Sequence, residues 1–509
     1  MVAKIKVDFE EALTLAGFGK YNVVLTLATI SVILSMTFEI LSVSFLVPAS
    51  ACELKTTVPQ QGLMAAVPML GIIATSHIWG YLADTRGRTT VLAWCLTLSF
   101  IFASLNTLAP NWIVFSILKF FSACAIAGTY ALIITLLSEC TPQSWRSKMV
   151  ALTSTVFLGS TATMAILSIP VLQLKFSYDI PALGITFNSW RLLNLVYALP
   201  CAIGILCMYL SYESPRYLLM AGEEEKSLEV LRGIFSINTG KSREEYKVES
   251  VTLGEESGKP TKGLIASIIS QTVPLLKPPL LKKTTLLSIM FIIVYFGINP
   301  FIVWLPFIAD AMMTSIRNGD KDFKMCDMIR SSQNATTVAV ETDNQDCSLD
   351  SYAMMAVFGI NIILATLNIV FSSLINVVGR KRMLIAIQLF AGAAGLCINL
   401  SPIWQLNAVL LVSYVLAGLN FGYISTICVE VFPTYVKAMA VCLTLMMGRG
   451  SSVLGISVLK NMMVSNCEAA LYMFPFLTFA GGIFAFCLPG DNEKEQKRVH
   501  QLEKRNVET

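Results

Sequence analysis

Charged residues are scarce in this chain. Only 14% of its 509 residues are Asp, Glu, Lys or Arg, whereas soluble globular proteins carry about 25%. So few charges cannot cover the surface of a water-soluble fold of this length, and a soluble protein is therefore excluded. The net charge of +4 is small, and no dense basic block with interleaved aromatic residues occurs, so we expect no nucleic-acid partner.

Other absences exclude several kinds of chemistry. The chain has two histidines, and its scattered carboxylates show no metal-ligand spacing, so no metal site is predicted. No glycine-rich loop ends in Gly-Lys-Ser or Gly-Lys-Thr, so nothing indicates ATP use and we expect no cofactor. The mixed-charge N-terminus lacks the apolar core and small-residue cleavage site of a removable signal peptide.

Long apolar runs are abundant, since 55% of the residues are hydrophobic. A membrane-spanning helix needs about 20 mostly apolar residues, and twelve runs meet this requirement. The predicted spans are Asn22–Val47, Gly62–Ala83, Thr89–Leu108, Trp112–Leu137, Met149–Leu172, Leu192–Ser211, Thr285–Ile308, Tyr352–Ile375, Met383–Leu400, Ile403–Val429, Ala438–Leu459 and Ala470–Leu488.

Basic residues in the short loops predict the orientation, because such residues favour the cytosolic side. Lysines and arginines follow the second, fourth, eighth and tenth runs, whereas the loops after the third and ninth runs carry none. We therefore expect an integral multi-pass protein in the plasma membrane or an intracellular vesicle, with both termini cytosolic. The expected parts are a cytosolic N-terminal segment (1–21), a first bundle (22–211), a cytosolic central loop (212–283), a second bundle (284–488) with an external loop (309–350), and a cytosolic tail (489–509).

The external loop carries two candidate modifications. Asn334 begins an Asn-Ala-Thr acceptor for N-glycosylation. Cys326 and Cys347 share this polar loop, and a disulfide between them is predicted if the loop faces an oxidising compartment. Cys52 and Cys467 can face the same side, so pairings with them stay open.

Two loop motifs recur at nearly the same offset. Glu139, Pro142 and Arg146 follow the fourth run, and Glu430, Pro433 and Lys437 repeat the acid–proline–base spacing after the tenth, 291 residues later (430 − 139). Gly87-Arg88 and Gly379-Arg380 follow the second and eighth runs with an offset of 292 (379 − 87). Two motifs in one register indicate a duplicated six-helix unit.

At these residues the chain resembles a known family. Gly80-x-x-x-Asp84-x-Arg86-Gly87-Arg88 looks like the loop motif of major facilitator superfamily transporters, whose halves are parallel repeats. Trp190-Arg191 and the segment 213–217 resemble the sugar and organic-ion branches, and the segments 18–21 and 421–434 look similar to the synaptic vesicle glycoprotein 2 group. The resemblance implies an all-α membrane protein with twelve transmembrane helices in two pseudo-symmetric six-helix bundles. Two features depart from the pattern. Asn376 stands near the position where the second motif should have an acid, and the external loop has about 40 residues where that group carries a large domain.

Three charges lie within predicted spans, where each costs about 2.5–3.5 kcal/mol on the insertion scale. Helical rise places Glu39 about 13 Å and Lys119 about 12 Å from the external ends of the first and fourth spans. We predict that these two residues form a charged element of the substrate pathway; a permanent ion pair that only fixes helix packing is the alternative. Arg449 lies near mid-membrane in the eleventh span, and either binds an anionic group or reaches water in the cavity.

The other predicted substrate-binding residues are polar groups of spans seven and ten. A Gly-Asn-Pro cluster in span seven is expected to interrupt the helix, which is tolerated where a helix lines a cavity. Tyrosine and asparagine offer orientable hydrogen bonds to a polar solute, although each also serves as a hydrogen-bonding contact between helices. The candidates are Tyr295, Asn299, Tyr414, Asn420 and Tyr423.

A second set of charges is predicted to form cytosolic gates. Asp84 can face a helix N-terminus or a base and hold one state of the carrier, and the resemblance places its partner near Ala438. The alternative is a solvated basic loop that only sets the topology. The predicted gating residues are Asp84, Arg86, Arg88, Glu139, Arg146, Arg380, Glu430 and Lys437.

These observations predict a monomeric transporter of a small polar or charged organic solute, working by alternating access as a uniporter or with a coupled proton or cation. An enzyme is not expected, because no paired catalytic residues at matching depth occur besides Glu39 and Lys119. The alternative function is a non-transporting vesicle or surface protein that acts as a receptor or trafficking partner through its two long loops.

Overall fold

The computed structural model describes residues 5–252, 272–278, 280–317, 319, 324–331, 349–432 and 434–488. The side chains of 147, 151, 154, 158, 375, 376, 429, 430 and 434–438 are not described. Asn334 and Cys347 lie outside these residues. The chain divides into two compact units, the first made of 1–54 and 67–264 and the second of 55–66 and 265–509.

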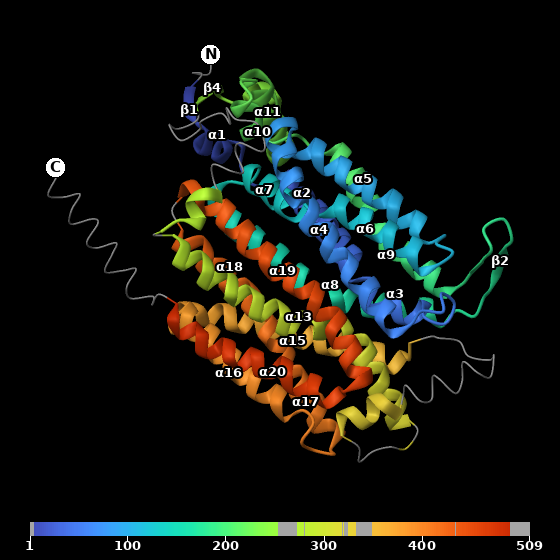
Figure 1. The fold of residues 1–509 in the computed structure, drawn as a ribbon. Helices are drawn as coiled ribbons and strands as arrows, with labels where there is room; N and C mark the ends of the chain where they lie inside the picture. Colours follow the sequence, from blue (N-terminus) through green and yellow to red (C-terminus); the bar gives the residue numbers. More distant parts are fainter. Residues whose placement is uncertain are drawn as a thin grey trace. The chain divides into compact units, whose positions relative to one another are not determined.

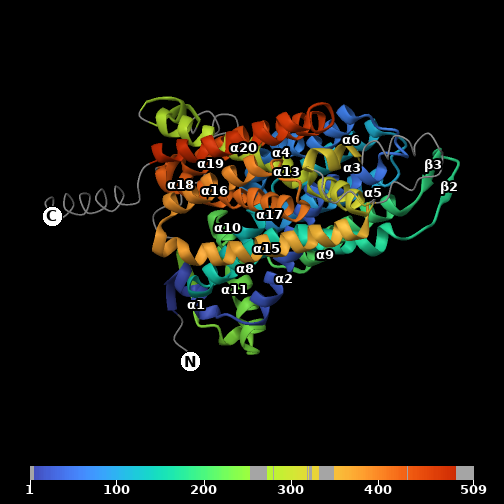
Figure 2. The ribbon, with the colours of Figure 1, turned by 90° about the horizontal axis from the view of Figure 1, so that it is seen from below.

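The helices of the first unit follow the first six predicted spans (Figure 1). The first and fourth spans are each broken, the first at Ser42 and the fourth at Ala127-Gly128. The helices are α2 (Lys20–Leu41), α3 (Val43–Ser50), α4 (Val58–Arg86, with residues 67–86 in this unit), α5 (Arg88–Asn106), α6 (Trp112–Ile126), α7 (Thr129–Glu139), α8 (Gln143–Leu172) and α9 (Ser189–Leu210). A two-stranded antiparallel hairpin, β2 (Tyr178–Ile180) and β3 (Ile185–Phe187), stands off the helices before α9 (Figure 2).

The N-terminal segment and the first part of the central loop fold together into a small module on the first unit (Figure 1). Strand β1 (Ile5–Asp8) pairs in parallel with β4 (Val248–Thr252). Tyr246 donates a hydrogen bond from its hydroxyl to the Ala12 carbonyl over 2.6 Å. The helices of the module are α1 (Phe9–Ala16), α10 (Pro215–Met220), α11 (Glu224–Thr239) and η1 (Arg243–Glu245).

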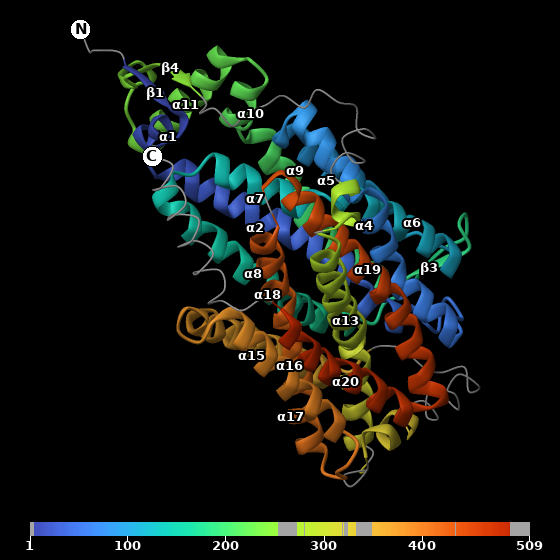
Figure 3. The ribbon, with the colours of Figure 1, turned by 60° about the vertical axis from the view of Figure 1, so that its left-hand side comes forward.

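The second unit repeats the pattern of spans. Its elements are η2 (Val273–Leu276), α13 (Leu281–Arg317), α15 (Ser351–Val378), α16 (Arg380–Cys397), α17 (Trp404–Val415), η3 (Leu416–Leu419), α18 (Asn420–Val431), α19 (Thr434–Ser465), α20 (Cys467–Phe484) and η4 (Ala485–Cys487). Helix α13 lies along α19, and α16 lies along α20 (Figure 3). Apolar side chains of α13, α16, α18 and α19 form a core cluster in this unit.

Ten segments of the described residues are long and apolar enough to span a membrane, and α8, bent by 41°, makes eleven. Helix α16 is the twelfth. It has 18 residues and begins with Arg380-Lys381-Arg382, and these three basic residues make it more highly charged than the other spans. Residues such as Leu384 and Ala391 are nevertheless fully buried against its neighbours. The chain is therefore an integral multi-pass membrane protein, with twelve membrane-spanning segments among the described residues.

The internal repeat is visible in backbone geometry. Helices α6 and α17 begin at Trp112 and Trp404, an offset of 292 (404 − 112), and both are broken before the second half of the span. Gly87 and Gly379 precede α5 and α16 with nearly the same backbone angles, φ 100°, ψ 150° and φ 91°, ψ 147°. These angles lie in a region that is essentially reserved for glycine, so the glycines of the repeated motif are required by the same turn in both units.

Two predictions about local structure are wrong. Helix α13 continues through the Gly-Asn-Pro cluster without interruption, because neighbouring helices hold this stretch: Gly297 packs on Thr478 of α20 and Pro300 packs on Gly455 of α19. Cys326 forms its disulfide with Cys467, at a Cα–Cα distance of 5.6 Å, and not with Cys347. Residues 325–331 are helical and hold Cys326 against the start of α20.

Candidate functional site

A buried ion pair joins α2 and α6 in the first unit. The Lys119 Nζ lies 2.8 Å from the Glu39 Oε1, and the two side chains are 1% and 6% exposed. These are the residues that helical rise places at one depth. An ammonium group has three donors, and among the described residues Lys119 has no acceptor besides Glu39. The pair therefore retains donors that a polar solute or water can use.

Small polar groups surround this pair. The Ser99 and Ser122 hydroxyls lie 3.1 Å apart, and both side chains are fully buried. Cys201 of α9 lies within hydrogen-bonding range of Ser35 and Ser99 and within electrostatic range of both charges. The surroundings of the pair are thus polar but contain no second carboxylate among the described residues.

The six candidate binding residues of the second unit fall into two groups. In the first group, the polar end of the side chain already forms a hydrogen bond to a neighbouring helix. The Asn299 amide donates to the Ser452 hydroxyl over 2.6 Å, Tyr414 bonds the Gly297 carbonyl, and the Asn420 amide donates to the Gln388 side chain. These contacts correspond to the packing alternative.

In the second group, the polar end has no partner among the described residues. The Tyr423 hydroxyl is buried and unpaired, and no hydrogen bond or ion pair is formed there by Tyr295 or Arg449. The Tyr295 ring lies 4.5 Å from that of Phe421 and packs on Gly448, beside Arg449. These three residues lie on the neighbouring helices α18, α13 and α19.

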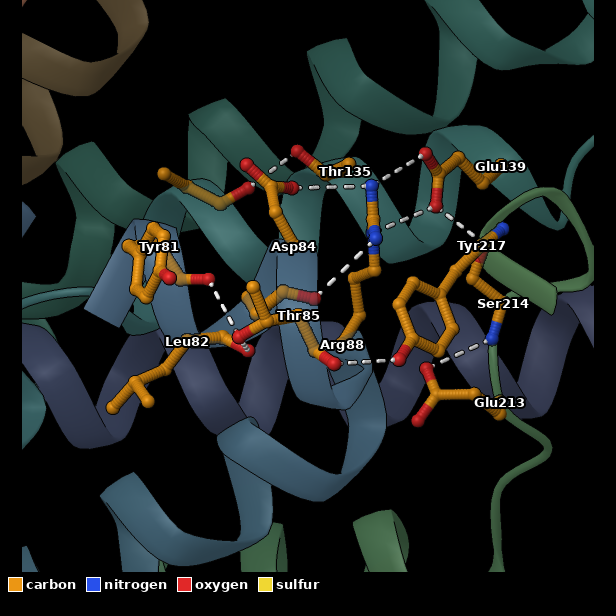
Figure 4. A network of polar contacts seen from close by, with 12 residues as sticks. Tyr81, Leu82, Asp84, Thr85, Arg88, Thr135, Glu139, Glu213, Ser214 and Tyr217 are labelled. Carbon is orange, nitrogen blue, oxygen red and sulfur yellow. Dashed lines mark hydrogen bonds and ion pairs between the residues drawn. The ribbon is translucent and has the colours of Figure 1, made fainter. Parts of the chain in front are cut away.

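The predicted gate of the first unit is centred on Arg88 (Figure 4). The Arg88 Nε lies 3.3 Å from the Glu139 Oε2, and its Nη2 lies 3.4 Å from the Asp84 Oδ1. The side chain of Glu139 is 9% exposed, whereas that of Asp84 is 66% exposed. Arg88 therefore holds a buried acid on α7 and a solvent-facing acid on α4.

Two residues that the sequence analysis did not assign to the gate complete this network (Figure 4). The Ser214 hydroxyl donates to the Glu139 carboxylate. The Glu213 carboxylate accepts from the Thr89 amide at 2.9 Å and the Thr90 amide at 3.3 Å, and so caps the N-terminus of α5 with negative charge. Both belong to the segment 213–217, which resembles the sugar and organic-ion transporter branches.

The other predicted gating residues are placed differently. Arg146 does not join Arg88, but binds Glu10 of α1, with 2.8 Å between Nη2 and Oε1. Arg86 ends α4 and forms no ion pair among the described residues. Arg380 begins α16 after Gly379, and the side chains of Glu430 and Lys437 lie outside the description, so the mirrored gate stays a prediction.

A further charged cluster lies at the opposite end of the first unit. The Arg191 side chain is fully buried, and its Nη2 lies 2.6 Å from the Glu53 Oε1. Glu53 also accepts from the Asn188 amide and the Trp190 indole, each at 2.6 Å. Glu53 follows the first apolar run, so the search for charges within spans missed it. Its contacts fix the turn after α3 to the start of α9.

Comparisons with known proteins agree with this architecture. The Sugar (and other) transporter family model matches residues 14–315, and the Major Facilitator Superfamily model matches 331–508. The structure resembles that of the xylose transporter XylE from E. coli in a partially occluded inward-open conformation, with a TM-score of 0.65 and 15% identity, covering 93% of this chain and 99% of that one. This likeness shows the fold.

Curated relatives match shorter stretches. Synaptic vesicle 2-related protein of Xenopus laevis is 30% identical over 232 residues, which is 45% of this chain and 39% of that protein. Synaptic vesicle glycoprotein 2B of Homo sapiens is 25% identical over 234 residues, 45% of this chain and 34% of that protein. The matched stretch thus spans less than half the length of these relatives. The family match covers more than half of the chain, and the chain belongs to the sugar (and other) transporter family of the major facilitator superfamily, a family of transporters and not of enzymes.

Proposed function

We propose that this protein carries a small polar or charged organic solute across a membrane by alternating access. The observation that carries the proposal is the buried Glu39–Lys119 pair within a major facilitator fold. A buried ion pair is weak evidence for stability, since apolar residues of similar volume often do as well. The pair lies within two membrane spans, and Lys119 has ammonium donors without an acceptor among the described residues. Both observations favour a role in binding.

In the proposed carrier, each unit carries its own set of polar groups. Glu39 and Lys119 supply a charged element in the first unit, and Glu39 also offers a carboxylate that can take up a coupled proton. Tyr295, Tyr423 and Arg449 supply unpaired polar groups in the second unit. Asn299, Tyr414 and Asn420 act mainly by holding these helices in register, because their side chains already bond neighbouring helices.

The proposal includes a topology and a location. Both termini and the module of α1, α11, β1 and β4 face the cytosol, and Glu53 and the Cys326–Cys467 disulfide face the outside or a vesicle lumen. Disulfides persist in such oxidising compartments, which supports this assignment. The protein acts as a monomer in the plasma membrane or an intracellular vesicle, and no solute is bound covalently.

An uptake panel in proteoliposomes tests the proposal. Purified protein is reconstituted and supplied with labelled sugars, organic cations and organic anions, with and without a pH gradient. At least one class should accumulate above protein-free vesicles, and Glu39→Gln and Lys119→Ala proteins that fold should lose that uptake. Normal uptake by both variants would remove the pair from the pathway, and no uptake of any class would refute the carrier function.

A second candidate function is that of a membrane receptor or trafficking partner that moves no solute. The observation that favours it is the folded module at the predicted cytosolic end, in which strands β1 and β4 form a two-stranded sheet, so that both are edge strands. Such edges can pair with a strand of another protein. The absence of uptake of every solute in the panel, together with mislocalisation of the protein after deletion of residues 5–16, would favour this function.

A further inference from the structure

Helix α19 carries a buried lysine that the predicted spans did not include. Lys460 is 3% exposed, and its Nζ lies 3.3 Å from the centre of the Phe307 ring and 4.7 Å from that of the Trp304 ring. The Trp304 indole donates to the Ile456 carbonyl over 3.1 Å, which fixes its orientation. The eleventh predicted span ends at Leu459, one residue before this lysine, so the charge was not counted.

No anion faces Lys460 within the part of the chain that the structure describes. Its ammonium group forms no ion pair and no hydrogen bond to these residues, although it has three donors. Asp310 lies one helical turn beyond Phe307, but it accepts a hydrogen bond from the Asp350 amide at 2.7 Å, and its charged neighbours are Asp350 and Arg317. The two rings stabilise the cation but accept none of its donors in a conventional hydrogen bond.

The other buried cations among the described side chains have carboxylate partners. Arg191 lies 2.6 Å from Glu53, Lys119 lies 2.8 Å from Glu39, and Arg88 lies 3.3 Å from Glu139. A buried charge without a partner is strongly destabilising. Lys460 therefore departs from the rule that the first unit follows, and the donors of its ammonium group are open to an anion from outside the described residues.

A second unpaired cation shares its face of α19. Arg449 precedes Lys460 by eleven residues, which corresponds to about three helical turns and a rise of about 16 Å. Arg449 is half-buried and forms no ion pair among the described residues. The distance is too great for one small anion to bridge both groups, so the two cations mark successive positions along one helix face.

We propose that Lys460 and Arg449 are successive binding positions for the negative group of the transported solute, which is an organic anion bearing a carboxylate, sulfonate or phosphate. This inference rests on the proposed carrier function and specifies its substrate class. Lys460 lies about 7 Å from the end of α19 at Ser465, at 1.5 Å per residue. It is therefore the first position met from that end, and Arg449 is the deeper one.

Anion binding is measured by thermal unfolding of the full chain in phosphatidylcholine nanodiscs, at constant ionic strength. The probes are benzoate, benzenesulfonate and phenyl phosphate, with tetraethylammonium and glucose as a cation and a neutral solute. At least one anion should raise the unfolding temperature of the wild type. Lys460→Gln should weaken that anion's apparent affinity by about tenfold or more, and Lys460→Arg should retain it.

Lys175→Gln is the matched control, because Lys175 is exposed in the loop that follows α8. It should leave anion affinity unchanged. Stabilisation by tetraethylammonium or glucose alone, or equal anion affinity in wild type and Lys460→Gln, would overturn the inference. Lys460-dependent stabilisation by phosphatidylglycerol with no effect of the soluble anions would also overturn it, because the cation would then hold a lipid phosphate.

The carrier function and the anion site fail in different ways. If the proteoliposomes move no solute but anions still stabilise the protein through Lys460, the carrier function is refuted and the binding site remains. If they move an organic cation or a sugar with undiminished rate in Lys460→Gln, the carrier function remains and the anion site is refuted.

Discussion

At the scale of single residues, burial determines which charges matter. Glu39 and Lys119 are both removed from solvent, whereas Lys226 and Glu223 form an exposed pair whose side chains are 67% and 44% exposed. Solvent screens the charges of the exposed pair. In the buried pair, loss of one member leaves the charge of the other without a partner. The two pairs therefore provide a direct internal comparison.

Removing one member of the buried pair should destabilise the protein strongly. We expect Glu39→Gln or Lys119→Met to lower the free energy of unfolding by about 3–5 kcal/mol, because the remaining charge is left buried without a partner. The double variant Glu39→Leu/Lys119→Met should lose less than either single variant. Thermal unfolding in detergent measures this, with Lys226→Met as a control that changes it by less than about 1 kcal/mol. A double variant worse than both singles would contradict the expectation.

The acids around Arg88 should differ in their effects. Asp84 is largely exposed, so Asp84→Asn should leave stability nearly intact while shifting the balance between inward-open and outward-open states. Glu139 is buried against Arg88 and Ser214, so Glu139→Gln should also lower stability, by about 1–3 kcal/mol. Reaction rates of single-cysteine probes at each end of the pathway report the state. Unaltered rates in Asp84→Asn would count against a gating role.

At the scale of elements, the junctions between helices are specified by a few residues. The turn before α5 depends on Gly87, because a Cβ there would collide with the Glu213 carboxylate oxygen that caps the helix. The corresponding turn before α16 depends on Gly379. Both glycines belong to the repeated motif, and the turn at Gly87 places Arg88 at the start of α5.

We expect Gly87→Ala to cost about 1–3 kcal/mol from the backbone conformation alone, with a further loss from displacement of Glu213. Gly80→Ala is the matched control, since Gly80 lies within α4 and a Cβ there meets nothing within 4 Å. Thermal unfolding and the accessibility of probes near Thr89 measure the effect. Equal stability of the two alanine variants would show that the turn tolerates a side chain.

The contact between the N-terminal segment and α11 centres on Asn238. Its side chain accepts from the Tyr21 amide at 3.0 Å and donates to the Gly17 carbonyl at 2.9 Å. Asn238→Ala should release α1, so that proteases cleave the segment 5–17 several times faster. Thr239→Ala, which removes an exposed hydrogen bond within α11, should leave the cleavage rate unchanged. Equal cleavage of the two variants would show that other contacts, such as Tyr246 to Ala12, hold the segment.

At the scale of the whole molecule, the Cys326–Cys467 disulfide closes a long loop of the second unit. Cys326 and Cys467 are 141 residues apart in sequence. Their disulfide ties residues 325–331 to the start of α20, at the end of the unit that is predicted to face away from the cytosol.

Loss of this disulfide should destabilise the second unit by about 4–5 kcal/mol in chain-entropy terms. Cys326→Ser, Cys467→Ser and the double variant should be equally affected, because each removes the same bond. Peptide mapping without reduction should recover the linked pair, and Cys487→Ser, which alters an exposed free cysteine, should change neither result. A linked peptide joining Cys326 to another cysteine would contradict the structure.

Local sequence determined much of this fold. Apolar runs set the helices because a bilayer requires continuous apolar length, and the repeated Gly-Arg motif set the two matching turns because only glycine adopts their conformation. Helical rise was enough to place Glu39 and Lys119 at the same depth, whereas their contact depends on the packing of α2 against α6.

Only the tertiary structure decided the partners that lie far apart in sequence. Arg146 binds Glu10 instead of the Arg88 network, Cys326 binds Cys467 instead of Cys347, and Lys460 rests on two aromatic rings. Each of these contacts depends on which helices pack side by side. A pattern within one helix does not carry that information, because the same spacing is compatible with many neighbours.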